Sequence, residues 1–126
     1  MAVCKGFRDL EVWQKGMDLA VEVYRIMKVF PREEQFGLTS QMRRAAASIP
    51  ADIAEGQARS HGREFQRFVS MALGSDAELQ THLELAVRLE YLEEATGTQL
   101  QEKTNTMARM LQGLHRSLNS TRPISS

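Results

Sequence analysis

A few acids and one histidine are the best candidates for chemistry in this sequence. Glu78 and His82 are four residues apart, so on a helix their carboxylate and imidazole would share one face. With Glu55 they could act in acid–base catalysis, and alone they could give two ligands to a metal. Carboxylate di-metal bundles, however, need a Glu-x-x-His motif on each of two helices, and this sequence contains neither. We therefore expect no metal site.

Motifs for nucleophiles and for phosphate binding are also missing from the sequence. The single cysteine, Cys4, has no histidine near it, and there is no Gly-x-Ser-x-Gly elbow, phosphate loop or Rossmann glycine pattern. We expect a protein without enzyme activity and without a cofactor. An enzyme that uses Glu55, Glu78 and His82 is the least favoured of three function classes.

Helices must position these side chains, because the composition is rich in Leu, Ala, Met, Glu, Arg and Gln and poor in aromatic residues (6%). The length of 126 residues fits one domain. Apolar periodicity and short connections predict an all-α, antiparallel up-and-down four-helix bundle over residues 1–118, followed by a flexible C-terminal tail at 119–126. The predicted helices cover residues 9–29, 38–58, 63–92 and 99–118.

Local signals place the helix ends and one irregularity. The predicted caps and breaks are Asp9, Thr39 or Ser40, Ser60-His61-Gly62 and Thr96-Gly97-Thr98. Pro50 falls inside the apolar pattern of the second helix, where it lacks the amide hydrogen that would bond to the carbonyl of Ala46. Because this disturbance costs roughly 3 kcal/mol, we expect the surrounding packing to hold a kinked second helix.

Charge and hydropathy exclude several function classes. The 16 Lys and Arg residues balance 16 Asp and Glu residues, so no net charge draws the protein toward nucleic acid or a membrane. No apolar run approaches the roughly 18 residues that span a bilayer, and residues 1–5 lack the apolar core of a signal peptide. A single cysteine fits a reducing compartment. We expect a soluble, cytoplasmic protein with no membrane partner.

Charge is nevertheless uneven along the chain. Five arginines gather between residues 43 and 67, and because guanidinium groups match pairs of phosphate oxygens, RNA or DNA is one expected partner. The alternative for two of these arginines is an ordinary ion pair along the helix surface. The alternative pairs are Arg59 with Glu55 and Arg67 with Glu64. The candidate nucleic-acid contacts are Arg43, Arg44, Arg59, Arg63 and Arg67.

Acids dominate the chain from residue 76 to residue 102, where seven carboxylates accompany a single arginine, Arg88. A scaffold that recruits a basic protein through this acidic segment of the third helix is therefore the second function class.

A further polar group lies close to the predicted core. Asp76 falls on the apolar stripe of the third helix, and a carboxylate buried there needs partners because unpaired burial is costly. A polar row along the second helix could supply them, so we expect a structural network rather than catalysis. The members of the predicted network are Ser48, Asp52, Glu55, Ser75 and Glu78.

The first helix carries two apolar stripes, although a bundle needs one. The stripe through Met17, Ala20 and Tyr24 is expected to face the core. The stripe through Val12, Leu19 and Val23 either widens the core of a monomer or contacts another copy. We favour a homo-oligomer, because large exposed apolar patches are rare on monomers. The candidate interface residues are Val12, Leu19, Val23, Ile26, Leu85, Leu89 and Leu92.

Several blocks of residues, taken in order, resemble a known family. They are Phe7-x-x-Leu10-x-Val12-Trp13-Gln14-Lys15, Phe36-Gly37-Leu38, Arg43-Arg44-Ala45-Ala46-x-Ser48-Ile49-Pro50-Ala51-x-Ile53-Ala54-Glu55-Gly56 and Glu64-Phe65-x-x-Phe68. Over residues 7–92 the chain resembles the four-helix bundle proteins encoded by intervening sequences in bacterial 23S rRNA genes. The resemblance implies a ring-shaped homopentamer. It extends to the accessory variability determinant of diversity-generating retroelements, a basic pentamer that binds nucleic acid and a reverse transcriptase. Asp52 stands where the family commonly has Asn.

Overall fold

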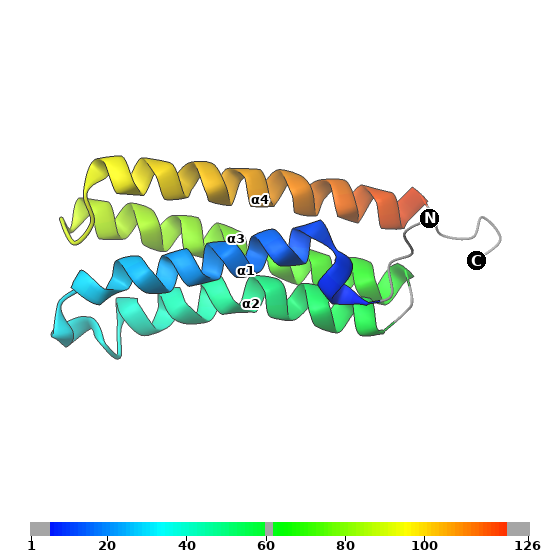
Figure 1. Ribbon diagram of the computed structural model, residues 1–126, viewed down its shortest axis with the longest axis horizontal. Helices are drawn as coiled ribbons and strands as arrows, with labels where there is room; N and C mark the ends of the chain where they lie inside the picture. The colour runs from blue at the N-terminus through cyan, green and yellow to red at the C-terminus, as the bar shows by residue number, and fades with distance from the viewer. Residues whose placement is uncertain (1–5, 60–61, 121–126) are drawn as a thin grey trace.

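Four long helices form the protein, as the apolar periodicity predicts. The computed structural model describes residues 6–59 and 62–120, and this part of the chain contains helices but no strand. The elements are η1 (Phe7–Asp9), α1 (Glu11–Ile26), η2 (Met27–Val29), η3 (Arg32–Glu34), α2 (Leu38–Ala58), α3 (Gly62–Arg88) and α4 (Glu94–Ser120). Each helix runs antiparallel to the next, so α1 and α3 point in the same direction (Figure 1). The all-α, up-and-down prediction is confirmed. Cys4, Ser60, His61 and most of the predicted tail lie outside the described residues.

The first two helices begin at residues other than the predicted caps. The turn η1 includes Asp9, so α1 starts one residue later, with Leu10 in an extended conformation at its N-cap. The N-cap of α2 is Gly37, and the amide of Leu38 donates a 3.1 Å hydrogen bond to Glu34 Oε1. Caps at Asp9 and at Thr39 or Ser40 are therefore wrong. A glutamate from the preceding turn accepts the first hydrogen bond of α2 instead.

The break between the last two helices also differs from the prediction. α3 ends at Arg88, and the chain turns at Glu90, whose φ of 65° lies in the left-handed region. Gly97 does not break the chain but lies inside α4. A Cβ at Gly97 would come 2.5 Å from Val87 Cγ2, so the glycine lets α4 approach α3 closely. Packing, rather than a turn, explains this glycine.

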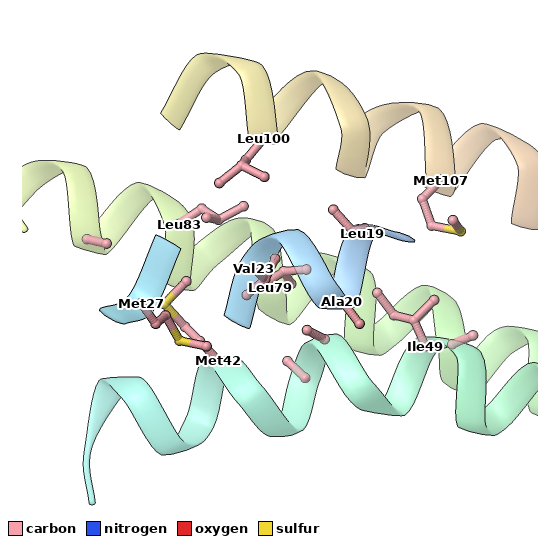
Figure 2. Close-up of a cluster of buried hydrophobic side chains, with 14 of the residues drawn as sticks. Leu19, Ala20, Val23, Met27, Met42, Ile49, Leu79, Leu83, Leu100 and Met107 are labelled. Atoms are coloured by element: carbon pink, nitrogen blue, oxygen red, sulfur yellow. The ribbon is translucent and has the colours of Figure 1, made fainter. Parts of the chain in front are cut away.

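The core lies between all four helices and is built almost entirely of aliphatic side chains (Figure 2). Leu79 and Leu83 of α3, and Leu100 and Met107 of α4, are spaced four and seven residues apart, so each pair shares one face of its helix. The labelled members are Leu19, Ala20 and Val23 of α1, Met27 of η2, Met42 and Ile49 of α2, Leu79 and Leu83 of α3, and Leu100 and Met107 of α4.

The helix α2 continues through Pro50, whose ring is buried. Opposite Pro50 stands Gly16 of α1. A Cβ at Gly16 would lie 3.6 Å from both Pro50 Cβ and Ile49 Cγ2, a normal packing distance. The side of α1 that contains Gly16 is therefore packed directly against α2 at the proline. The bend expected of α2 stays a prediction.

One polar contact joins the two connections at the same end of the bundle. Tyr91, between α3 and α4, donates a 2.9 Å hydrogen bond to Glu34 Oε2, and this bond raises the pKa of Tyr91. The ring of Tyr91 also lies 5.7 Å from that of Phe30. Since Glu34 Oε1 accepts from Leu38, this one carboxylate fixes both the start of α2 and the α3–α4 connection.

Candidate interaction surface

An apolar groove runs along the outside of the bundle between α1 and α2. Large side chains of α1 form one wall, and Met17, Val21 and Tyr24 remain 40%, 44% and 43% exposed. Small residues of α2 form the other wall, and the volume of the groove is about 580 Å³. We call it the α1–α2 groove. Its lining is Trp13, Met17, Ala20, Val21, Tyr24, Arg25, Lys28, Arg43, Ala47, Pro50, Ala51 and Ala54.

The charged residues of the α1–α2 groove are all basic. Arg25 comes from the C-terminal end of α1, Lys28 from the turn η2 that follows it, and Arg43 from the facing part of α2. The guanidinium carbon of Arg43 lies 5.7 Å from the centre of the Tyr24 ring, within range of a cation–π contact. Positive charge is therefore concentrated at one end of an otherwise apolar groove.

The two stripes of α1 are placed differently from the prediction, although Ala20 is buried as expected. Val12, Leu19 and Val23, expected at an interface, are buried in the core of the chain itself, as is Leu92. Ile26 is half-buried, and Leu85 and Leu89 are exposed. Met17 and Tyr24, expected in the core, line the groove. The contact of Gly16 with Pro50 explains the exchange, because it turns the glycine-containing side of α1 inward.

A second apolar surface follows the outside of α3. Met71 is 44% exposed, Leu85 44% and Leu89 45%, and the spacings of fourteen and four residues place all three on one side of the helix. We call these three residues the α3 ridge. Val87, which packs against Gly97 of α4, lies on the opposite side of α3. The ridge therefore points away from α4.

The five candidate arginines fall into two groups. Arg59 pairs with Glu55 at 3.0 Å and Arg67 with Glu64 at 3.1 Å, so the helix-surface pairs are confirmed. Both guanidiniums also lie over the ring of Phe68, 5.3 and 5.0 Å from its centre. Within the described residues, no carboxylate pairs with Arg43, Arg44 or Arg63, which are all exposed.

The predicted polar network does not form a connected set. Among the described residues, no hydrogen bond or ion pair joins Ser48, Asp52 or Glu55 of α2 to Ser75 or Glu78 of α3. Glu78 Oε2 lies 3.6 Å from His82 Nε2, and Glu55 pairs with Arg59. Burial, and then the nearby charge of Glu55, raises the pKa of Asp52.

Asp76 is an acidic residue buried in the core. Its side chain is 1% exposed, and its Oδ2 accepts a 2.9 Å hydrogen bond from Gln80 Nε2, while its Oδ1 has no partner in the described part of the chain. Burial disfavours the ionised form and raises the pKa of Asp76 to about 6, although the bond from Gln80 opposes the shift. One bond within the same helix replaces the expected contacts from α2.

Neither a metal cluster nor a membrane span is found in the described residues. They contain no group of three His, Cys, Asp or Glu side chains placed to hold a metal ion. None of the helices described by the structure is long and apolar enough to cross a membrane.

Comparison with known proteins gives the family. A protein of unknown function from the S23 ribosomal protein family of Bacteroides thetaiotaomicron has a similar fold, with a TM-score of 0.74 at 22% identity. The match covers 82% of this chain and 97% of that one. No curated protein matches the chain. The model of the 23S rRNA-intervening sequence protein family matches residues 8–113. The chain therefore belongs to the 23S rRNA-intervening sequence protein family.

Proposed function

We propose that this protein is a non-enzymatic, cytoplasmic scaffold that works as a homo-oligomer. The observation that supports the proposal is the α1–α2 groove, in which Met17, Val21 and Tyr24 remain about half exposed. Full burial of such a side chain stabilises by about 1.5–3 kcal/mol, so covering the exposed halves of these three gives roughly 2–4 kcal/mol per groove. The resemblance to pentameric relatives suggests a ring of five copies.

Light scattering after size-exclusion chromatography tests self-association over micromolar concentrations. We expect a mass well above the 14.3 kDa of one chain for the wild-type protein. Val21→Asp adds a charge to the centre of the groove and should lower that mass. Ala77→Asp adds the same charge on an exposed position of α3 and should leave the mass unchanged. A wild-type mass of 14.3 kDa at every concentration would contradict the proposal.

Weak binding of RNA or DNA is a second proposed function, and it rests on two arginines. Arg43 and Arg44 are adjacent, exposed and without an ion pair in the described residues, so in a single copy their charges are available for phosphates, and Arg44 lies outside the lining of the groove. The zero net charge of the chain limits the affinity, because phosphate neutralisation supplies most of it.

A matched pair of double variants tests the nucleic-acid site. Arg43→Ala with Arg44→Ala should weaken binding of a short RNA and reduce its dependence on salt by about two units of the log–log slope. Arg59→Ala with Arg67→Ala removes the same charge from arginines already paired with Glu55 and Glu64, and should change binding much less. Equal effects of the two double variants would contradict the assignment of the site.

A further inference from the structure

We infer that the copies associate head to tail, with the α3 ridge of one copy seated in the α1–α2 groove of the next. The inference rests on the proposed self-association and names its two surfaces. The groove offers a strip of exposed apolar side chains with small alanines beside them, and the ridge offers three large ones, Met71, Leu85 and Leu89. Each copy of the chain therefore offers its groove to one neighbour and its ridge to another.

Charge favours the contact of groove with ridge over the two symmetric arrangements. A contact of groove with groove puts no acid opposite Arg25, Lys28 and Arg43, because the charged residues of the groove are all basic. A contact of ridge with ridge likewise puts none of these basic residues opposite Glu78 and Glu90, the acids beside the ridge. Only the contact of groove with ridge places the basic groups of the groove against acids, and complementary charge of this kind favours one partner over others.

The acidic character of the ridge is not cancelled by its own arginine. Arg88 Nε lies 2.8 Å from Glu84 Oε2, which leaves Glu90 and Glu93 in the connection that follows α3, and Glu94 at the start of α4, in excess. This is the segment for which the sequence predicts a basic partner. The basic end of the α1–α2 groove on a second copy meets that description.

Length and direction also match. The groove extends from Trp13 to Lys28, about 22 Å along α1, and the ridge from Met71 to Leu89, about 27 Å along α3. The groove is basic at the C-terminal end of α1, and the ridge is acidic at the C-terminal end of α3. Matching the charges makes α3 of one copy parallel to α1 of the next. Since α1 and α3 point the same way within each bundle, neighbouring bundles stand parallel (Figure 1).

The positions of the two surfaces give the assembly its form. The groove lies on the α1–α2 side of the bundle, and the ridge on the flank of α3 that faces away from α4. These are neighbouring rather than opposite sides of the bundle. Each added copy is therefore rotated about the bundle axis relative to the one before it, always in the same sense. A head-to-tail contact that turns in this way closes into a ring when the rotation fits. The ring predicted from the family resemblance thus gains an interface.

Two variants, each blocked on one surface, test the inference. Val21→Asp blocks the groove, and the double variant Leu85→Asp with Leu89→Asp blocks the ridge. Each should be helical by circular dichroism and have the mass of a single chain, 14.3 kDa, by light scattering. An equimolar mixture should reach twice this mass and no more, because each variant keeps one intact surface. Ala77→Asp should assemble like the wild-type protein.

Three results would overturn the inference, and two of them separate it from the proposed function. If the wild-type protein assembles and the ridge variant does so as well, the head-to-tail contact is wrong but self-association stands. If the wild-type protein assembles and the mixture of folded variants stays at 14.3 kDa, the pairing of groove with ridge is wrong. If the wild-type protein is itself a single chain, both proposals fail.

Discussion

Replacing Gly56 by alanine should destabilise the bundle. A Cβ at this position would lie 2.7 Å from Phe68 Cβ and 3.0 Å from Phe65 Cδ1. The Phe68 atom is bonded directly to the backbone of α3, so Gly56→Ala must move the two helices apart. Overpacking of this kind costs about 1–3 kcal/mol, while replacing a helical glycine by alanine returns about 1 kcal/mol. We expect the free energy of unfolding to fall by up to about 2 kcal/mol.

Gly74→Ala is the matched control for this prediction. Gly74 lies within α3, and a Cβ there would have no atom within 4 Å, so only the helix-propensity gain of about 1 kcal/mol should remain. Urea unfolding followed by circular dichroism, at one protein concentration, compares both variants with the wild-type protein. The reasoning is refuted if Gly56→Ala is as stable as Gly74→Ala.

Five further substitutions test three contacts, two of them polar and one close-packed. The pKa of Asp76 is about 6 in the folded chain against 3.8, so its contribution to stability is present at low pH and is lost as pH rises from about 4 to 6. Asp76→Asn should therefore raise the free energy of unfolding at pH 7.5 by about 2–3 kcal/mol and change it little at pH 4; equal gains in urea titrations at both pH values would contradict this. Tyr91→Phe should lower the free energy of unfolding, and Glu34→Ala should lower it further, since Leu38 also loses its acceptor. Gly97→Ala should lower the melting temperature, because the added methyl group meets Val87, and a second substitution, Val87→Ala, should restore part of the decrease. A double variant that melts no higher than Gly97→Ala would contradict the proposed clash.

Periodicity in the sequence predicts which face of a helix is buried when the helix has a single apolar stripe. In α4 one stripe at helical spacing runs through Leu100, Thr104, Met107 and Leu111, which are all buried, and continues through Leu114 and Leu118, which are half-buried. For α1 the periodicity was not sufficient, because two stripes of similar apolarity compete. The choice between them depends on Gly16 meeting Pro50, a contact between residues 34 positions apart that no local pattern contains.

Glycines and caps were mispredicted for a related reason. Gly97 is a local turn signal, yet close approach to Val87 explains its presence within α4. Thr39 has the side chain of a good cap, but Glu34 reaches the first amide of α2 from the preceding turn. The arginines show the same limit, since spacing identified the pairs of Arg59 and Arg67 but not which charges remain unpaired. In each case a contact distant in sequence overrides a local preference.

Pro50 also affects how α2 can open. Pro50 has no amide hydrogen, so the hydrogen bond to the carbonyl of Ala46 is missing. The ladder of hydrogen bonds along α2 is therefore interrupted at this point. Residues 38–49 and 51–58 can therefore open as separate units, and amide hydrogen exchange should reveal two levels of protection within one continuous helix. A ligand held by Arg43 and Arg44 would slow exchange in the first unit only. The second unit, fixed to α3 at Gly56, would exchange as before.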